Sequence, residues 1–288
     1  MRHLLSTILI CLSFPALASA CKEEKLITHS FASKDVSQLL VNALAGSLEV
    51  NGDDSDTITI NARACADELK YLEQMTIDVD DSRDQLELTV IIPYRGFGWN
   101  ADYAFMDLEI TVPTDQLVKL RDSSGHLEVR DANVASIDDS SGDIRLFNIS
   151  GDLEVSDSSG DIYLRGMTGN LQVNDSSGRI DIQDVDGDVV IPRDSSGDID
   201  IDTVSGLVTI ERDGSGSIEI ENVKKGVNVH SDGSGDIRIS AVQGSVKIGN
   251  DGSGSVRIAQ VDGDFSIDAK GSGSIRTSGI KGSTDIPR

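Results

Sequence analysis

The sequence predicts an all-β protein, a single-domain parallel β-solenoid (β-helix) with coils of about 19 residues. Two observations support this fold class. A four-residue turn that ends in Ser-Gly recurs nine times, from Asp122–Gly125 to Lys270–Gly273, and the last five turn glycines are 19 residues apart. Aliphatic residues hold fixed offsets after the turn glycines, at +2, +4, +7, +11 and +13. The two pairs spaced by two residues are typical of two short, half-buried strands per coil.

A single coil of this kind has too small a core to fold alone, so stability must come from the interfaces between stacked coils. Because successive coils run in the same direction, equivalent strands should pair in parallel about 4.8 Å apart. The aliphatic rows would then form a dry interior, with the acidic corners in water. We expect the second glycine of many coils to make the tight turn into the second strand. These glycines are Gly187, Gly206, Gly244 and Gly263.

At the start of the chain, Arg2 precedes an apolar run over residues 4–14, and Ala18-Ser19-Ala20 follows. A basic start, a short apolar middle and small residues at the end are typical of a secretory signal peptide. We therefore expect residues 1–20 to be removed by cleavage after Ala20. The apolar run is too short to span a membrane, and no later run is long enough. The protein should be exported, to the periplasm or the cell surface.

Cys21, the first residue after that cleavage site, has two interpretations. It could carry a lipid anchor, although Ala18 stands where a lipoprotein signal usually has leucine. Alternatively it could pair with Cys65, the only other cysteine outside the signal peptide, in an oxidising compartment. That disulfide would tie down the new N-terminus and stabilise the fold by about 3 to 4 kcal/mol.

Residues 21–121 are less regular, and we expect them to form irregular β coils and a cap that are continuous with the regular repeats of residues 122–288. Three segments resemble imperfect coils of the same spiral: 39–41, 46–50 and 57–60. Three more alternate strictly between apolar and polar residues, which predicts strands: 75–79, 86–90 and 108–112. Residues 64–74 could contain a short helix.

These features resemble a known family. Leu48-Glu49-Val50 near the start, a Val112-Pro113 step and serial Ser-Gly-Asp-Ile elements such as Ser196-Gly197-Asp198-Ile199 are similar to the bacterial putative-adhesin β-strand-repeat family. The resemblance covers nearly the whole mature chain. It implies an exported, repetitive all-β fold and an adhesin-like function that is not itself well defined. It carries no catalytic residues to any position of this sequence.

An aspartate opens most of the turns and should form a column along the solenoid. The column comprises Asp122, Asp139, Asp157, Asp175, Asp194, Asp213, Asp232 and Asp251, and Lys270 ends it. Each carboxylate could accept a hydrogen bond from its own turn backbone. Alternatively, a ladder of carboxylates could bind Ca²⁺. For the calcium hypothesis the candidate ligands are Asp175, Asp194, Asp213, Asp232 and Asp251.

The serine before each turn glycine has a structural interpretation. Its hydroxyl could donate to a neighbouring hydroxyl or to a backbone carbonyl along the spiral. A catalytic serine would need a basic partner, and ninefold repetition argues against any single nucleophile.

Five of the eleven aromatic residues fall within 12 positions, around glycines that predict a long loop. They are Tyr94, Phe97, Trp99, Tyr103 and Phe105. Exposed aromatic side chains here would make a contact surface for a sugar or a partner protein. The alternative is that they fold over an open end of the solenoid as a hydrophobic lid.

The net charge of −24 excludes a general nucleic-acid binder, because phosphates would be repelled. In the first strand of successive coils, Arg238, Arg257 and Arg276 follow Asp181, Asp200 and Glu219 at the same offset. This basic stripe could hold an anionic polymer or simply be a solvated face balanced by nearby acids.

We expect a non-catalytic exported solenoid without cofactors, a monomer or weak oligomer that binds an envelope protein or a glycan. Two alternatives stay open: a polysaccharide-active β-helix enzyme, and a structural rod that binds calcium.

Overall fold

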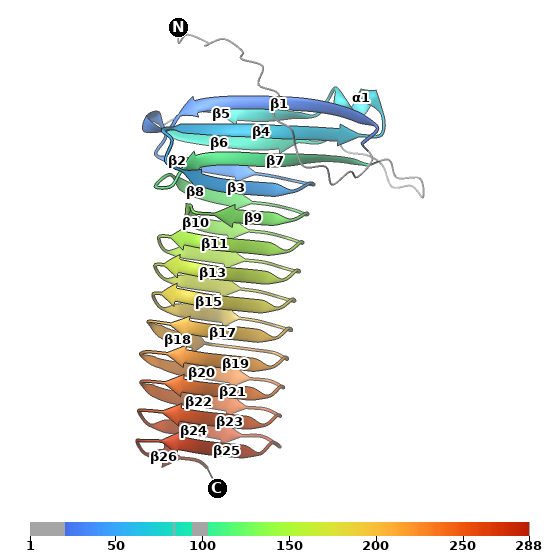
Figure 1. Ribbon diagram of the computed structural model, residues 1–288. Coiled ribbons are helices and arrows are strands. Elements are labelled where there is room, and N and C mark those ends of the chain that lie inside the picture. Colours follow the sequence, from blue (N-terminus) through green and yellow to red (C-terminus); the bar gives the residue numbers. More distant parts are fainter. Residues whose placement is uncertain (1–20, 83, 94–102, 288) are drawn as a thin grey trace.

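The computed structural model describes residues 21–82, 84–93 and 103–287. In this part of the chain the prediction of an all-β, single-domain parallel β-solenoid is confirmed: a straight stack of coils carries a more irregular N-terminal end (Figure 1). The predicted signal peptide and its cleavage site at Ala20 lie outside the described residues. No helix in the described part could cross a bilayer, since the α-helix found there, α1, has four residues.

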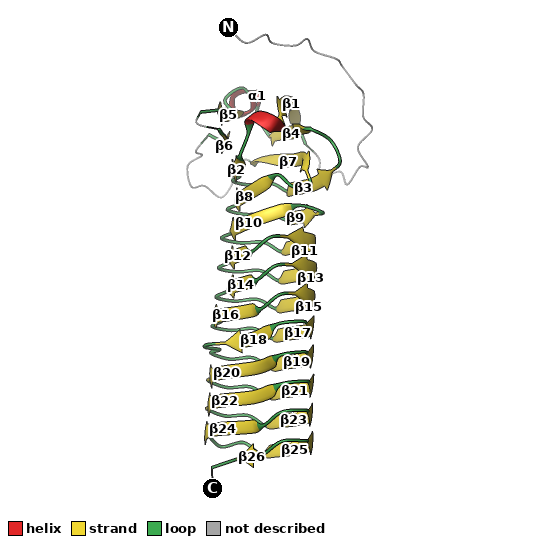
Figure 2. Ribbon diagram, turned by 90° about the vertical axis from the view of Figure 1, so that its left-hand side faces the viewer, coloured by secondary structure: helices red, strands yellow, loops and turns green. Residues whose placement is uncertain are grey.

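Each regular coil contributes one strand to each of two sheet faces, which Figure 2 shows side by side. The β9–β25 face consists of β9 (Leu127–Arg130), β11 (Ile144–Ser150), β13 (Ile162–Thr168), β15 (Ile180–Asp186), β17 (Ile199–Val204), β19 (Ile218–Val223), β21 (Ile237–Val242), β23 (Val256–Val261) and β25 (Ile275–Ile280). The β8–β26 face consists of β8 (Leu117–Arg121), β10 (Asn133–Asp138), β12 (Leu153–Ser156), β14 (Leu171–Asn174), β16 (Val189–Arg193), β18 (Leu207–Ile210), β20 (Gly226–Asp232), β22 (Ser245–Asp251), β24 (Phe265–Lys270) and β26 (Thr284–Asp285).

The strands of each face pair in parallel with their equivalents in the next coil, so identical offsets lie on top of one another. Ile199 pairs with Ile218, which pairs with Ile237, and all three side chains are fully buried. The rows at the other four offsets are buried in the same way. The predicted dry interior is therefore present, and it runs along the solenoid as one aliphatic core.

The prediction that a second glycine makes the tight turn between the two strands of a coil is wrong. The four predicted turn glycines, Gly187, Gly206, Gly244 and Gly263, do not have a left-handed backbone. Instead a residue at offset +6 does, for example Thr203 (φ 59°) and Asn222 (φ 56°). The second glycine serves close packing, because a Cβ on Gly206 would lie 2.1 Å from the carbonyl oxygen of Gly187 in the preceding coil.

The glycine of the Ser-Gly turn is required for both conformation and space. Gly235 has φ +151°, and a Cβ there would lie 1.5 Å from the carbonyl oxygen of Gly216. Gly216 and Gly254 have the same combination of positive φ and close backbone approach. Only glycine can therefore stack on itself at this corner.

The N-terminal end consists of longer strands and two short helical segments. They are β1 (Glu23–Ala32), the 3₁₀ turn η1 (Ser33–Asp35), β2 (Gln38–Asn42), β3 (Leu48–Asp53), β4 (Thr57–Ala66), α1 (Leu69–Leu72), β5 (Thr76–Asp80), β6 (Gln85–Ile91) and β7 (Ala104–Pro113). On one face the spatial order is β1, β4, β7, β3, β9, and on the other it is β5, β6, β2, β8, β10.

Two of the three predicted early coil segments are confirmed. Residues 39–41 and 48–50 lie in β2 and β3, which form a coil that stacks in parallel on β8 and β9. Residues 57–60 are not a coil, because β4 runs antiparallel to both β1 and β7. The chain leaves the spiral after β3, forms these antiparallel strands, and returns with β6 and β7 on the other side of the β2–β3 coil.

We predict that Gly235→Ala costs more than about 3 kcal/mol of stability, because the new methyl group would overlap backbone and occupy a strained φ. The matched control is Gly279→Ala, where φ is +66° but the nearest atom is 3.4 Å away. It should cost only about 1 kcal/mol. Urea unfolding followed by circular dichroism measures both, and equal losses would contradict this account of the turn.

Candidate functional site

The aspartate column lies inside the solenoid, not in water as the sequence analysis expected. All eight side chains are between 1 and 6 % exposed. Successive members stand in register, since Asp194 pairs with Asp213, Asp213 with Asp232, and Asp232 with Asp251. In the shorter coils the reason is alternation: Asp175 follows the buried Val173 by two residues and so faces the same side.

The first four aspartates confirm the turn interpretation. Oδ1 of Asp139 accepts hydrogen bonds from the backbone N–H groups of Ser140 (2.7 Å) and Ser141 (3.3 Å). Asp175 is held in the same way by the two residues that follow it. In each of these four residues, however, the second carboxylate oxygen is buried without a hydrogen-bond partner.

The later aspartates are less well satisfied. Neither carboxylate oxygen of Asp194, Asp213 or Asp232 has a good hydrogen-bond donor from the protein, and Oδ1 of Asp251 also lacks one. These residues begin Asp-Gly-Ser-Gly turns, apart from Asp194, whose turn is Asp-Ser-Ser-Gly. The coil spacing places each carboxylate beside those of its neighbours, where two of them can share a proton.

Burial raises the pKa of these carboxyl groups. Desolvation is the main cause, and the negative charge of the neighbouring aspartates adds to it for Asp194 and Asp213, whose pKa rises to about 7. The pKa of Asp232 rises to about 6 for the same two reasons. Part of the column therefore holds protons near neutral pH.

The serine column behaves as its structural interpretation predicts. The hydroxyl of Ser141 donates to the carbonyl oxygen of Ser123 in the preceding coil (3.1 Å), and Ser177 donates to Ser158 (3.2 Å). Among the described residues, no group of three or more His, Cys, Asp or Glu side chains comes together as metal ligands usually do. Calcium binding by Asp175, Asp194, Asp213, Asp232 and Asp251 stays a prediction.

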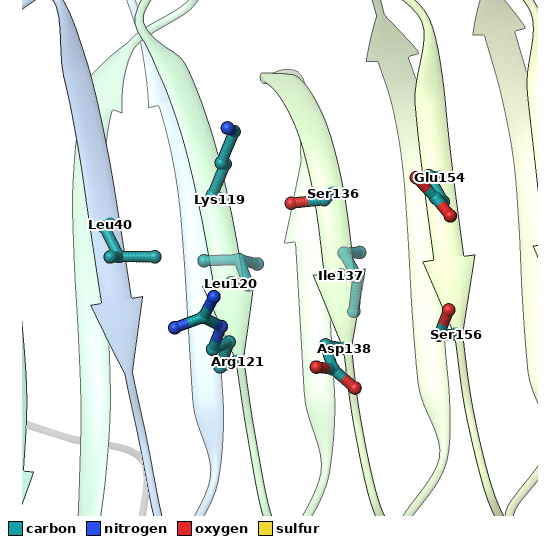
Figure 3. Close-up of a pocket in the computed structure, with 9 residues that line it drawn as sticks. All are labelled: Leu40, Lys119, Leu120, Arg121, Ser136, Ile137, Asp138, Glu154 and Ser156. Atoms are coloured by element: carbon teal, nitrogen blue, oxygen red, sulfur yellow. The ribbon is translucent and has the colours of Figure 1, made fainter.

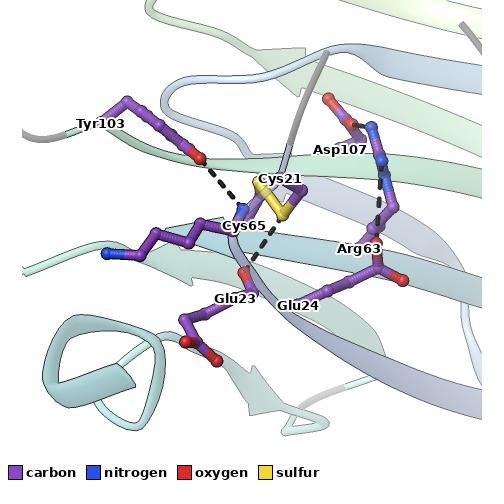
Figure 4. Close-up of a disulfide and its surroundings, with 8 residues drawn as sticks. Cys21, Glu23, Glu24, Arg63, Cys65, Tyr103 and Asp107 are labelled. Carbon is purple, nitrogen blue, oxygen red and sulfur yellow. Dashed lines mark hydrogen bonds and ion pairs between the residues drawn. A yellow bond between two sulfur atoms is a disulfide. The ribbon is translucent and has the colours of Figure 1, made fainter. Parts of the chain in front are cut away.

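The described part of the aromatic cluster lies at the N-terminal end, beside a disulfide bond (Figure 4). Cys21 is bonded to Cys65, with their Cα atoms 5.6 Å apart, so the Cys21 sulfur is not free for a lipid anchor. Tyr103 is 39 % exposed, and its hydroxyl accepts a hydrogen bond from the backbone N–H of Lys22 (3.0 Å). Tyr94, Phe97 and Trp99 lie outside the described residues.

Phe105 extends this aromatic surface toward a cation. Its ring centre is 6.2 Å from that of Tyr103 and 6.0 Å from the Arg63 guanidinium carbon. Asp107 holds that guanidinium at 2.7 Å. Aromatic rings beside a fixed arginine can contact both the apolar faces and the acidic groups of a ligand.

Shallow hollows lie on both described sheet faces. One of about 230 Å³ crosses β2, β8, β10 and β12, where Arg121 lies beside Asp138, and Lys119 and Glu154 lie on either side of Ser136 (Figure 3). A β-bulge between Val134 and Ser136 interrupts the strand register there. Val134 is the buried residue here and Ala135 is the extra one, which the spacing of the repeats could have indicated. The signal was the shorter interval of 17 residues between Gly125 and Gly142.

Fold and repeats together define a β-solenoid protein built on stacked glycine turns. The profile of the Toastrack family, DUF4097, matches residues 36–286, and the chain belongs to this family. No curated protein matches it significantly.

Three solved structures are similar to it at low identity. A "putative adhesin" from Bacteroides fragilis is 18 % identical, with 92 % of this chain and 99 % of that chain covered, at a TM-score of 0.39. A "putative adhesin" from Parabacteroides merdae is 13 % identical, with 91 % and 97 % covered, at 0.28. A "Putative lipid binding protein" from Parabacteroides distasonis is 16 % identical, with 91 % and 97 % covered, at 0.30. These names describe the other proteins and assign no ligand to this one.

We predict that the aspartate column makes the protein less stable as the pH rises from about 5 to 8. A carboxyl group whose pKa is raised in the folded state binds more protons there than in the unfolded chain, so folding weakens as these protons are lost. Asp213→Asn replaces one of these carboxyl groups by an amide, which is neutral at every pH and therefore loses no proton as the pH rises. The variant should melt about 2 to 6 °C higher than the wild type at pH 8 and close to it at pH 5.

The control is Asp268→Asn, which removes an exposed carboxylate on β24 whose side chain is 60 % accessible. It should change the melting temperature little at either pH. Scanning calorimetry of the three proteins across this range is the measurement. If Asp213→Asn has the same pH dependence as the wild type, the buried column does not control stability.

Proposed function

We propose that this protein is a non-catalytic exported rod that binds a glycan or a protein of the cell envelope through its N-terminal end. The observation that carries the proposal is the surface formed by Tyr103, Phe105 and Arg63 beside the Cys21–Cys65 disulfide. The disulfide and the bond from Lys22 to the Tyr103 hydroxyl hold this end rigid, which lowers the entropy cost of binding.

The rest of the rod supports a scaffolding role. The coils leave no deep groove over the described faces, and each turn aspartate has equivalents in adjacent coils. The carboxylates of an enzyme on such a fold must reach the substrate, whereas the turn aspartates are buried. The disulfide and the predicted signal peptide are consistent with life in the periplasm or at the cell surface.

We predict that Tyr103→Ala weakens binding to a glycan or peptidoglycan fragment about tenfold or more, because a rigid exposed ring is a typical binding hot spot. Trp99→Ala tests a second member of the aromatic cluster that the sequence predicts. Calorimetric titration against a panel of glucans, uronate polymers and muropeptides measures this, and no member of the panel should be turned over.

The matched control is Tyr163→Ala, which removes a tyrosine from the solenoid face on β13. It should bind as the wild type does. A large loss of melting temperature in Tyr103→Ala would show that the ring is part of a lid over the rod's end. Unchanged binding by both Tyr103→Ala and Trp99→Ala would contradict the proposal.

A calcium-loaded rod is the second candidate, favoured by the buried carboxylate oxygens of Asp194, Asp213 and Asp232 that have no hydrogen-bond partner. Calcium needs oxygen ligands and displaces protons, so binding should be strongest where the column is ionised. On this hypothesis chelator-treated protein takes up calcium at pH 8 and much less at pH 5. Calorimetric silence at millimolar calcium and pH 8 would rule it out.

A further inference from the structure

One outward row on the β9–β25 face changes sign halfway along the rod. Its six members stand in register on consecutive strands from β15 to β25, and the coils stack straight over this part of the rod (Figure 1). They are Asp181, Asp200, Glu219, Arg238, Arg257 and Arg276. Three acids are followed by three arginines, so the row is antisymmetric about the midpoint between Glu219 and Arg238.

The acidic half is a shallow hollow with excess negative charge. A depression of about 210 Å³ lies over β15, β17 and β19, and besides the row it is lined by Asp202, Glu221 and Arg179. Arg179 pairs with Asp200 and is the cation at its rim. Among the described residues, Glu219 forms no ion pair. Five carboxylates therefore face one guanidinium across this half.

The basic half has the opposite character. Asp236 binds the guanidinium groups of Arg238 (2.7 Å) and Arg257 (2.9 Å) through the same oxygen. Both side chains are nevertheless about 40 % exposed. A guanidinium has five N–H donors, so each retains donors for a further partner. Within the described chain, Arg276 has no ion pair.

The residues beside the row are larger in the acidic half than in the basic half. At offset +5 the acidic half carries Gln183, Asp202 and Glu221, and the basic half carries Ser240, Ala259 and Ser278 in the same register. The arginines therefore project beyond their small neighbours. A surface turned end for end would bring the long side chains of one half opposite the small ones of the other.

We propose that this row is the interface of a two-fold symmetric dimer in which two copies of the chain pack face to face with antiparallel rod axes. The two-fold axis runs along the strands and lies between β19 and β21. Asp200 then opposes Arg257 of the partner subunit, Glu219 opposes Arg238 of the partner subunit, and Asp181 opposes Arg276 of the partner subunit. Every pair occurs twice, as an isologous interface requires.

The size of the face sets the strength of the dimer. Six strands spaced about 4.8 Å apart, each about five residues or 16 Å long, cover about 500 Å² per subunit. The total of about 1,000 Å² is at the low end for a specific interface. Since the contacts are between exposed charges, salt should weaken them strongly. We expect a dimer that forms at about 100 µM protein in low salt and dissociates near 1 M NaCl.

Charge exchange tests the pairing. Asp200→Arg places two arginines opposite each other in a homodimer, and Arg257→Asp places two aspartates opposite each other. Sedimentation velocity of the full mature chain should show that each variant alone dimerises at least tenfold more weakly than the wild type. An equimolar mixture of the two should dimerise again, because both contacts are then between opposite charges. The double variant Asp200→Arg/Arg257→Asp should also recover.

The matched controls lie on the β8–β26 face, where the Lys247 Nζ and an Asp268 carboxylate oxygen are 3.3 Å apart. Lys247→Asp and Asp268→Arg change the net charge by the same amounts and should leave dimerisation as in the wild type. If Asp200→Arg does not fold, Glu219→Arg and Arg238→Glu provide a second pair for the same mixing experiment.

Any one of four results would overturn the proposal. The first is a wild-type protein that stays monomeric at 100 µM in low salt. The second is failure of the mixed variants to associate. The third is equal loss in the control variants, which would show that net charge alone drives association. Binding of an acidic polysaccharide by the arginines without a dimer would also contradict it and would identify the row as a polyanion site.

Discussion

The structure depends on one constraint: parallel backbone hydrogen bonds hold each coil about 4.8 Å from the next. The bonds recur at the same point in successive coils, as from the N–H of Gly216 to Ser234 and from that of Gly235 to Ser253. Every side chain therefore lies on its own equivalent. Aliphatic side chains are stabilised by this stacking because each is buried against its equivalents. A turn position that leaves no room for a Cβ must be glycine in every coil.

The same stacking explains why the polar rows have consequences for the whole molecule. A single buried aspartate could be held by its turn amides, as Asp139 is. The aspartate column also places carboxylates next to one another, which raises the pKa of Asp194 and Asp213 to about 7. Part of the column therefore stays protonated near neutral pH. On the outside, stacking turns isolated charges into stripes, and a stripe that reverses sign provides a self-complementary surface.

The two ends of a solenoid are where stacking fails, because the last coil has unpaired backbone groups. At the N-terminal end the chain continues the sheets with the antiparallel strands β1, β4 and β5, which do not follow the spiral path. The disulfide from Cys21 to Cys65 joins β4 to the residue two places before β1. This end differs from the repeats in strand length, direction and aromatic content, so it can carry a specific site that a uniform coil cannot.

The sequence alone determined the solenoid, its two strands per coil, its aliphatic rows and the Cys21–Cys65 pairing as one of two options, because periodicity and spacing are local properties. It did not determine that β2 and β3 form a coil between β6–β7 and β8–β9, since that order joins segments far apart in the chain. It also misplaced the aspartate column, because polarity predicts exposure whereas side-chain direction depends on the backbone path. Tertiary structure decided which residues share a surface, since register between coils is set by backbone hydrogen bonds and not by any residue type.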